Sequence, residues 1–120
     1  DMEEAKARAG IVSAAHIING NMAIAGWKGG IENASAVAAQ AADELLDIRG
    51  IESSYVLTQM GDQINISARS LGKINVQLIM EELGGGGHMT VAGAQLRQTS
   101  LEEAEEKVVA AIQAVLERKA

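Results

Sequence analysis

Four consecutive glycines, Gly84 to Gly87, stand directly before His88 in the stretch ELGGGGHMTVAGAQL. One glycine is enough to end a helix, and each further glycine costs about 0.5–1 kcal/mol relative to alanine in a regular element. Without Cβ atoms, the backbone can approach a ligand closely and turn its N–H groups toward an anion. The run therefore predicts a phosphate-binding loop, and the alternative is a helix end at Gly84 followed by a flexible connection.

Four polar side chains near this run favour the phosphate interpretation. His88 can donate a hydrogen bond to a phosphate oxygen, and the guanidinium of Arg69 matches phosphate oxygens as a fork. Ser67 shares the polar face of a strand with Arg69, whereas Asn75 is open between capping a helix and contacting a ligand. Each also has a structural interpretation, in which the histidine is simply satisfied and the arginine pairs with a carboxylate. For His16, in an apolar strand, we favour the structural interpretation.

Catalytic machinery is not evident in the sequence. Phosphodiester hydrolysis usually needs divalent metals held by clustered Asp and His residues, and the two histidines here are isolated. There is no cysteine, which excludes thiolate metal sites. We therefore expect a chain that holds a phosphorylated ligand without cleaving it, with no catalytic residue beyond possible assistance from His88 and no metal ligand of its own.

The composition limits the kind of core and the kind of ligand that the chain can have. The 120 residues are 48% hydrophobic with one Trp, one Tyr and no Phe, so small aliphatic side chains must fill a single core. The net charge of -6 would repel a long nucleic acid, while a short anionic ligand in a local pocket stays possible. The absence of cysteine and of a leader favours the cytoplasm. Because the chain starts at Asp1 and is helical from the outset, we expect a piece of a longer protein.

Local patterns predict helices and strands in alternation. Turn residues at 19–21 and 61–62 close two hairpins, and a capping box at 100–103 opens a final helix. Helices are expected over residues 2–13, 33–47, 73–83 and from 101 onward, and strands on either side of 19–21 and over 53–60, 63–70 and 92–98. The fold class is therefore α/β, with a mixed β-sheet of about five strands packed with helices.

The run ISARSLGKINVQLIMEELGGGGHMTVAGAQL, residues 66–96, resembles the C-terminal DHH-associated domain of the DHH (Asp-His-His) phosphoesterase superfamily, which carries a Gly-Gly-Gly-His loop. It is most similar to the bacterial cyclic-di-AMP phosphodiesterases, and the similarity extends more weakly over residues 15–118. On this basis residues 1–14 are the end of a linker helix and residues 15–120 a substrate-binding domain. The resemblance implies that Gly84 to Gly87 and His88 form the substrate loop, with Ser67, Arg69 and, less directly, Asn75 beside it.

The resemblance also implies partners that the sequence does not contain. In that family a separate DHH domain holds the metals, usually Mn²⁺, and the associated domain closes over the cleft to bind the nucleotide. We expect a cyclic dinucleotide or short nucleotide substrate, a parent anchored to the bacterial plasma membrane, and a homodimer as a further possibility. The alternatives are an oligoribonuclease, exonuclease or phosphonucleotide phosphatase parent, and a non-catalytic nucleotide-binding or regulatory module.

Overall fold

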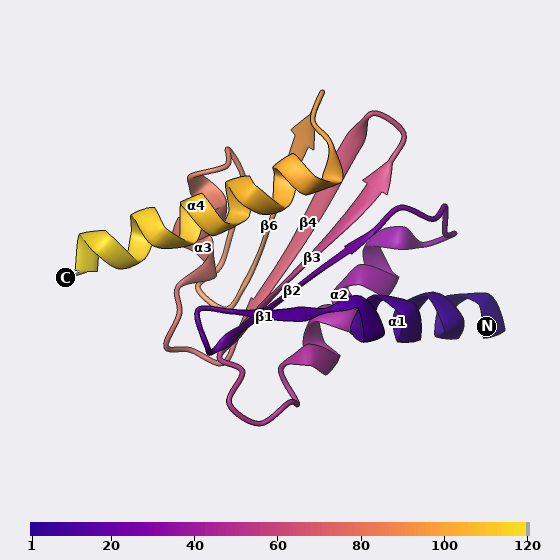
Figure 1. Cartoon of the computed structure of the whole chain (residues 1–120), viewed down its shortest axis with the longest axis horizontal. Helices are drawn as coiled ribbons and strands as arrows, with labels where there is room; N and C mark the ends of the chain where they lie inside the picture. The colour runs from indigo at the N-terminus through magenta and orange to yellow at the C-terminus, as the bar shows by residue number, and fades with distance from the viewer. Residues whose placement is uncertain (120) are drawn as a thin grey trace.

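The computed structural model describes residues 1–119 as one six-stranded sheet with four helices (Figure 1). The predicted α/β class is confirmed. The helices are α1 (Met2–Ala14), α2 (Ala34–Leu45), α3 (Val76–Glu81) and α4 (Leu101–Lys119). The strands are β1 (His16–Ile18), β2 (Met22–Trp27), β3 (Ser53–Met60), β4 (Gln63–Ser70), β5 (Gly86–Gly87) and β6 (Val91–Arg97).

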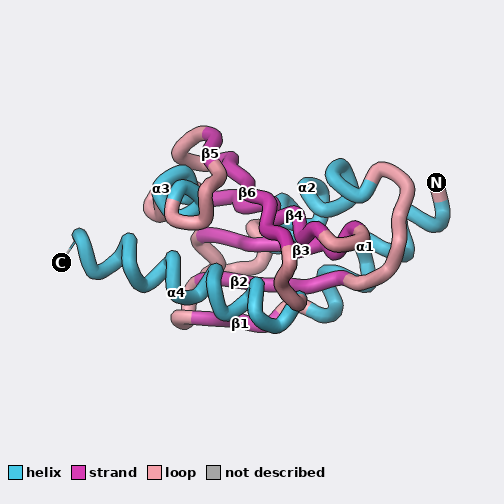
Figure 2. The backbone as a smooth tube through the Cα atoms, turned by 90° about the horizontal axis from the view of Figure 1, so that it is seen from above, coloured by secondary structure: helices cyan, strands magenta, loops and turns pink. Residues whose placement is uncertain are grey.

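The strands lie in the order β1-β2-β3-β4-β6-β5, with β1 and β5 at the two edges of the sheet (Figure 2). The β2–β3 pair is parallel because α2 connects these strands, and the other pairs are antiparallel. The sheet has one strand more than the five expected. The additional strand is β5, which consists of two glycines and so has no side-chain alternation by which the sequence could reveal it.

Helices cover both faces of the sheet and produce two apolar clusters. In β4, Ile64, Ile66 and Ala68 face a cluster that also contains the buried sides of α3 and α4, as the alternation predicts. The opposite cluster lies between α1, α2 and the centre of the sheet, where Ile11, Val37 and Val56 are buried. The odd-numbered side chains of β4 face this second side of the sheet.

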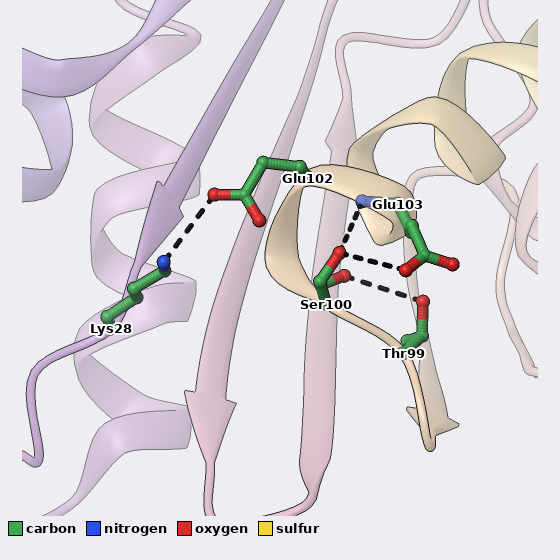
Figure 3. A network of polar contacts seen from close by, with 5 residues as sticks. All are labelled: Lys28, Thr99, Ser100, Glu102 and Glu103. Carbon is green, nitrogen blue, oxygen red and sulfur yellow. Dashed lines mark hydrogen bonds and ion pairs between the residues drawn. The ribbon is translucent and has the colours of Figure 1, made fainter.

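Of the capping box predicted at the start of α4, the bond from the Glu103 N–H to the Ser100 hydroxyl is formed, whereas the Glu103 carboxylate contacts the Ser100 hydroxyl and not the Ser100 N–H (Figure 3). The Ser100 hydroxyl accepts a hydrogen bond from the Glu103 N–H at 3.1 Å, and it lies 3.3 Å from the Glu103 carboxylate. Lys28, at the end of β2, lies 3.5 Å from the carboxylate of Glu102. The backbone N–H of Glu102 and then the Lys28 ammonium hold the pKa of the Glu102 carboxyl below its usual value. These contacts fix the helix start beside β2.

Two helices differ from the prediction in their bounds and ends. Helix α3 is shorter than residues 73–83, and its buried side consists of Val76, Ile79 and Met80, whereas Leu78 is 37% exposed. Because Ile74 lies before the helix, its spacing of four residues to Leu78 does not place the two side chains on one helical face. At the start of α2, Asn33 has a left-handed φ of 58° and its side chain makes no capping bond, although asparagine is a preferred N-cap residue. Within residues 1–119, no helix is both long and apolar enough to cross a bilayer.

Candidate functional site

The site residues predicted on β4 lie on a partly uncovered face of the sheet. Helix α2 packs on the centre of the sheet, and the strands β4, β6 and β5 lie toward one edge, where α2 covers them only in part. The surface of these three strands on the α2 side of the sheet is called the open face. Strand pairing places residues of neighbouring strands directly opposite one another, with side chains on one side. The β4–β6 register therefore aligns Asn65 with Gln95, Ser67 with Gly93 and Arg69 with Val91 on the open face.

The pairing of β5 with β6 places the end of the glycine run beside the same face. Gly86 pairs with Gly93, so that Ser67, Gly93 and Gly86 form one row, here called the floor row. The His88 N–H donates to the Val91 carbonyl at 2.7 Å, which places His88 opposite Val91 in the row of Arg69. The strand register thus places Ser67, Arg69, Gly86 and His88 at positions on one face of the sheet.

A hollow of about 470 Å³ opens on this face. Its walls come from β4, β6, the loop before β5 and the first turn of α2, and no ionisable side chain lines it. The lining residues are Ser35, Asn65, Ile66, Ser67, Gly84, Gly85, Gly93, Ala94 and Gln95. Of these, Ser35, Asn65, Gly93 and Gln95 were not predicted as site residues, because only the strand register and the position of α2 show that they meet.

Three of the four glycines in the run have structural reasons to be glycine. Gly84 has a left-handed φ of 82° at the end of α3. A Cβ at Gly85 would lie 2.1 Å from the Gly93 carbonyl oxygen, and one at Gly87 would lie 2.6 Å from the Val91 carbonyl oxygen. At Gly86 a Cβ would meet nothing within 4 Å, and the backbone is not left-handed. Gly86 is therefore the glycine of the run that the fold itself does not require.

The backbone N–H groups of the loop are mostly used within the chain, contrary to the expected amide cradle. Gly84 N–H donates to the Glu81 carbonyl at 3.1 Å, and Gly85 N–H to the Met80 carbonyl at 2.8 Å. Because pairs alternate in antiparallel strands and the His88 N–H already donates to Val91, the Gly87 N–H faces outward at the sheet edge. Of the four glycines, Gly86 leaves its backbone uncovered by a Cβ, and Gly87 directs one N–H donor away from the sheet.

The guanidinium of Arg69 is directed toward α2 and not toward the glycine loop. Its Nε lies 3.4 Å from the Asp43 carboxylate, and its Nη1 donates to the Ala68 carbonyl at 3.0 Å. This is the carboxylate pairing that the sequence left open as the structural alternative. The sequence-based hypothesis that the Arg69 guanidinium and the glycine loop are aimed together at one shared anion is therefore wrong, because the side chain points to Asp43.

Asn75 and Ser67 have different roles in the structure. The Asn75 side chain accepts a hydrogen bond from the Leu78 N–H at 3.2 Å and so caps α3, the structural alternative of the two considered. Ser67 is half-buried in the hollow, and its hydroxyl makes no hydrogen bond within the described chain. Its donor and acceptor positions are available to a ligand.

A second hollow of about 430 Å³ lies between β1 and α4, lined in part by His16. Three glutamates, Glu102, Glu105 and Glu106, also line it, and their carboxylates would repel a phosphate. Within residues 1–119, no group of three or more His, Cys, Asp or Glu side chains is placed to hold a metal ion. The described residues thus do not fit a manganese site of their own.

A family model described as the DHHA1 domain matches residues 19–118 of the chain. The chain belongs to the DHHA1 domain family. The resemblance seen in residues 66–96 is therefore confirmed, and it extends over most of the sequence.

Curated relatives of this DHHA1 domain include two bacterial phosphodiesterases. It is 46% identical over 108 residues to the cyclic-di-AMP phosphodiesterase PdeA of Listeria monocytogenes, covering 89% of the chain and 16% of PdeA. It is 44% identical over 106 residues to the cyclic-di-AMP phosphodiesterase GdpP of Geobacillus thermodenitrificans, covering 88% of the chain and 16% of GdpP. The chain thus spans only a small part of the length of both relatives.

A solved structure supports the fold. The crystal structure of an exopolyphosphatase-related protein from Bacteroides fragilis matches 95% of the DHHA1 domain and 35% of its own chain, with a TM-score of 0.82. The two are 20% identical in sequence, so this likeness shows a shared fold.

Proposed function

We propose that this DHHA1 domain is the substrate-recognition part of a metal-dependent phosphodiesterase that hydrolyses cyclic-di-AMP to the linear dinucleotide. The observation that carries the proposal is the floor row, in which Ser67 is followed across two strands by the bare backbone of Gly93 and Gly86. A ligand can approach such a floor closely, because no Cβ stands above it at two of its three positions. The names of two relatives at 44% and 46% identity support the choice of substrate.

The roles of the side chains follow from their rows. Arg69 and His88, one row beyond the floor row, would bind phosphate oxygens, and the Ser67 hydroxyl would complete the contact. For Arg69 this requires the guanidinium to rotate away from Asp43 or to be shared with it. His88 would stand at the scissile phosphate and stabilise charge that develops there. The metals, for which we expect Mn²⁺, would come from a DHH domain of the parent protein, which would also hold the hydrolytic water.

The pairing of the glycines argues against the non-catalytic alternative in which the run is a hinge. Gly86 and Gly87 form a strand with β6, and Gly85 and Gly87 are packed against that strand too closely to accept a Cβ. A hinge requires backbone that can change its dihedral angles freely, whereas this segment is held by strand pairing. Close packing on β6 accounts for the glycines at positions 85 and 87, and contact with the ligand would account for the glycine at position 86.

The test is a titration of the isotope-labelled chain with cyclic-di-AMP, followed by backbone amide chemical shifts. We expect weak binding with shifts concentrated at Ser67, Gly86 and His88, and no hydrolysis with Mn²⁺ added. The variant Gly86→Ala should keep its thermal stability and lose at least about tenfold in affinity. Gly30→Ala is the matched control, because a Cβ at Gly30 also meets nothing within 4 Å.

Two results would count against the proposal. If the Gly86→Ala variant and the unmodified chain bind cyclic-di-AMP with equal affinity, the ligand does not approach the floor row closely. Turnover by the purified 120-residue chain would show that the metals and the hydrolytic machinery need not come from a separate domain.

A further inference from the structure

The hollow of about 430 Å³ between β1 and α4 lies on the face of the sheet opposite the open face. Helix α4 passes the β1 edge of the sheet there (Figure 2). The α4 residues in its lining recur every three or four positions, so they form one stripe along the helix, about 16 Å long at 1.5 Å per residue. We call this hollow the acidic groove. Its α4 wall consists of Glu102, Glu105, Glu106, Val109, Ala110 and Gln113, and His16 and Ile24 complete the lining.

The carboxylates gather at one end of the acidic groove, toward the start of α4. The Glu102 carboxylate lies 3.5 Å from the Lys28 ammonium. Glu105 and Glu106 form no ion pair within residues 1–119, and Glu105 is half-buried. A carboxylate that is partly removed from water gains more from a cation beside it than a fully exposed one does. This end of the groove therefore favours a positively charged ligand.

The basic side chains of α4 lie on its other side. Lys107 lines a hollow beside α3, and the Arg118 guanidinium lies 3.3 Å from the carboxylate of Glu82, at the end of α3. A ligand that enters between α4 and β1 thus meets the carboxylates of the helix without its cations.

The middle of the acidic groove is apolar. Ile24 of β2 is buried, Val109 is half-buried and Ala110 is exposed. The small side chain of Ala110 allows another backbone to approach α4 closely, and contact with Val109 and Ile24 removes apolar surface from water. Charge at one end and apolar surface in the middle are complementary to a ligand that is both basic and amphipathic.

We propose that the acidic groove binds a basic amphipathic helix of another protein. Its lysine or arginine side chains pair with Glu105 and Glu106, and its apolar side chains contact Val109 and Ala110. A helix presents side chains every three or four residues, which is the period of the stripe on α4. An extended chain gains less here, because β1 offers only three residues for strand pairing. The carboxylates repel phosphate and nucleic acid.

This interaction is independent of the proposed function. The acidic groove and the open face lie on opposite sides of the sheet, so both can be occupied at once.

The test uses two synthetic helical peptides with the same leucine and alanine face, one with lysine and the other with glutamate at the flanking positions. Each is titrated into the isotope-labelled chain, and backbone amide shifts are followed. We expect the lysine peptide to shift His16, Glu105, Val109 and Gln113 and to bind at least about tenfold more tightly than the glutamate peptide. Its affinity should fall severalfold between low and high salt.

Three variants locate the contact. Glu105→Gln and Glu106→Gln should each weaken binding of the lysine peptide by about two- to fivefold. Ala110→Gln should weaken it as well, because the longer side chain stands where the peptide helix packs, while glutamine is tolerated at an exposed helical position. Asp47→Asn is the matched control, since it removes one exposed carboxylate beyond α2, on the other side of the sheet. The amide spectrum of each variant reports whether it is folded.

Four results would overturn the proposal. The first is the absence of shifts in the acidic groove at the highest concentration of the lysine peptide. The second is equal affinity for the two peptides, which would mean that the carboxylates do not select the ligand. The third is an equal loss in Asp47→Asn and Glu105→Gln, because binding would then follow the net charge of -6 and not the groove. The fourth is a shift of the groove amides on dilution of the chain alone, which would identify a second copy as the occupant.

Discussion

The guanidinium Nε of Arg69 lies 3.4 Å from the Asp43 carboxylate oxygen, across the gap between β4 and α2. The Arg69 side chain is 15% exposed, whereas that of Asp43 is 67% exposed, so water screens the pair from one side. An anion bound on the open face must therefore compete with a carboxylate that is already in place. Asp43 places a negative charge beside Arg69, so its removal should favour binding of the proposed anionic ligand.

The variant Asp43→Asn tests this competition. We expect the affinity for cyclic-di-AMP to rise by about two- to fivefold, the equivalent of an exposed ion pair worth up to about 1 kcal/mol. The free energy of unfolding should change by less than about 1 kcal/mol for the same reason. Titrations at low and high salt measure the effect, and Asp47→Asn, just beyond α2, serves as a surface control. Weaker binding by Asp43→Asn would mean that the carboxylate orients Arg69 for the ligand.

Substitution of Gly85 should damage the fold, unlike substitution of Gly86. A Cβ at Gly85 would lie 2.6 Å from the Ala94 Cβ and 2.1 Å from the Gly93 carbonyl oxygen, and backbone cannot move aside cheaply. We expect Gly85→Ala to lower the free energy of unfolding by about 1–3 kcal/mol. Urea denaturation of Gly85→Ala and Gly86→Ala measures the difference. Equal midpoints for the two variants would contradict the close packing of the loop on β6.

Removal of the Ser100 hydroxyl should destabilise α4. The hydroxyl satisfies the Glu103 N–H, one of the four N–H groups that a helix start leaves without partners. Ser100→Ala should therefore cost about 1 kcal/mol. Thr99→Ala is a suitable comparison, because the Thr99 hydroxyl makes only a 3.5 Å contact with the Ser100 carbonyl. A larger loss for Thr99→Ala than for Ser100→Ala would show that the box does not stabilise the helix start.

Tyr55 should make the fold sensitive to alkaline pH. Its side chain is fully buried, and burial raises its pKa from 10.0 to about 12, against the opposing effect of the Ser53 hydroxyl. The unfolded chain loses the phenol proton near pH 10 and the folded chain retains it to about pH 12. The free energy of unfolding should therefore fall by roughly 2–3 kcal/mol over this interval.

Urea titrations at pH 8, 10 and 11.5 measure this fall, with Tyr55→Phe as the variant that cannot ionise. Its stability at pH 8 should be lower because the Ser53 hydroxyl loses its partner, but its further decline above pH 10 should be shallower. Parallel declines of both proteins would show that other groups cause the alkaline unfolding.

The sequence predicts most of the regular elements because their determinants are local. The bounds 53–60 and 63–70 agree with β3 and β4, since alternation and a glycine-containing turn act over a few residues. The N-cap bond of Ser100 likewise marks the start of α4. Strand β5 escaped prediction because two glycines have no pattern, and Asn65 and Gln95 escaped it because they are thirty residues apart and meet only through strand pairing.

The arrangement of the predicted site residues could be read from the sequence only in part. Strand alternation places Ser67 and Arg69 on one face of β4, and only the sheet register adds the position of His88. The Asp43 pairing of Arg69 and the internal acceptors of the Gly84 and Gly85 N–H groups depend on distances between elements that are separate in sequence. Local patterns carry no information about such distances.

The two outermost strands of the sheet are also its shortest, with three residues in β1 and two in β5. An edge strand this short offers few backbone groups of its own to another extended chain, although it also leaves part of the neighbouring strand β2 or β6 uncovered. Association of two copies by joining their sheets edge to edge would thus be held by only a handful of hydrogen bonds. The same brevity protects the domain against edge-templated aggregation, and titrations at the high concentrations that weak ligands demand become practical.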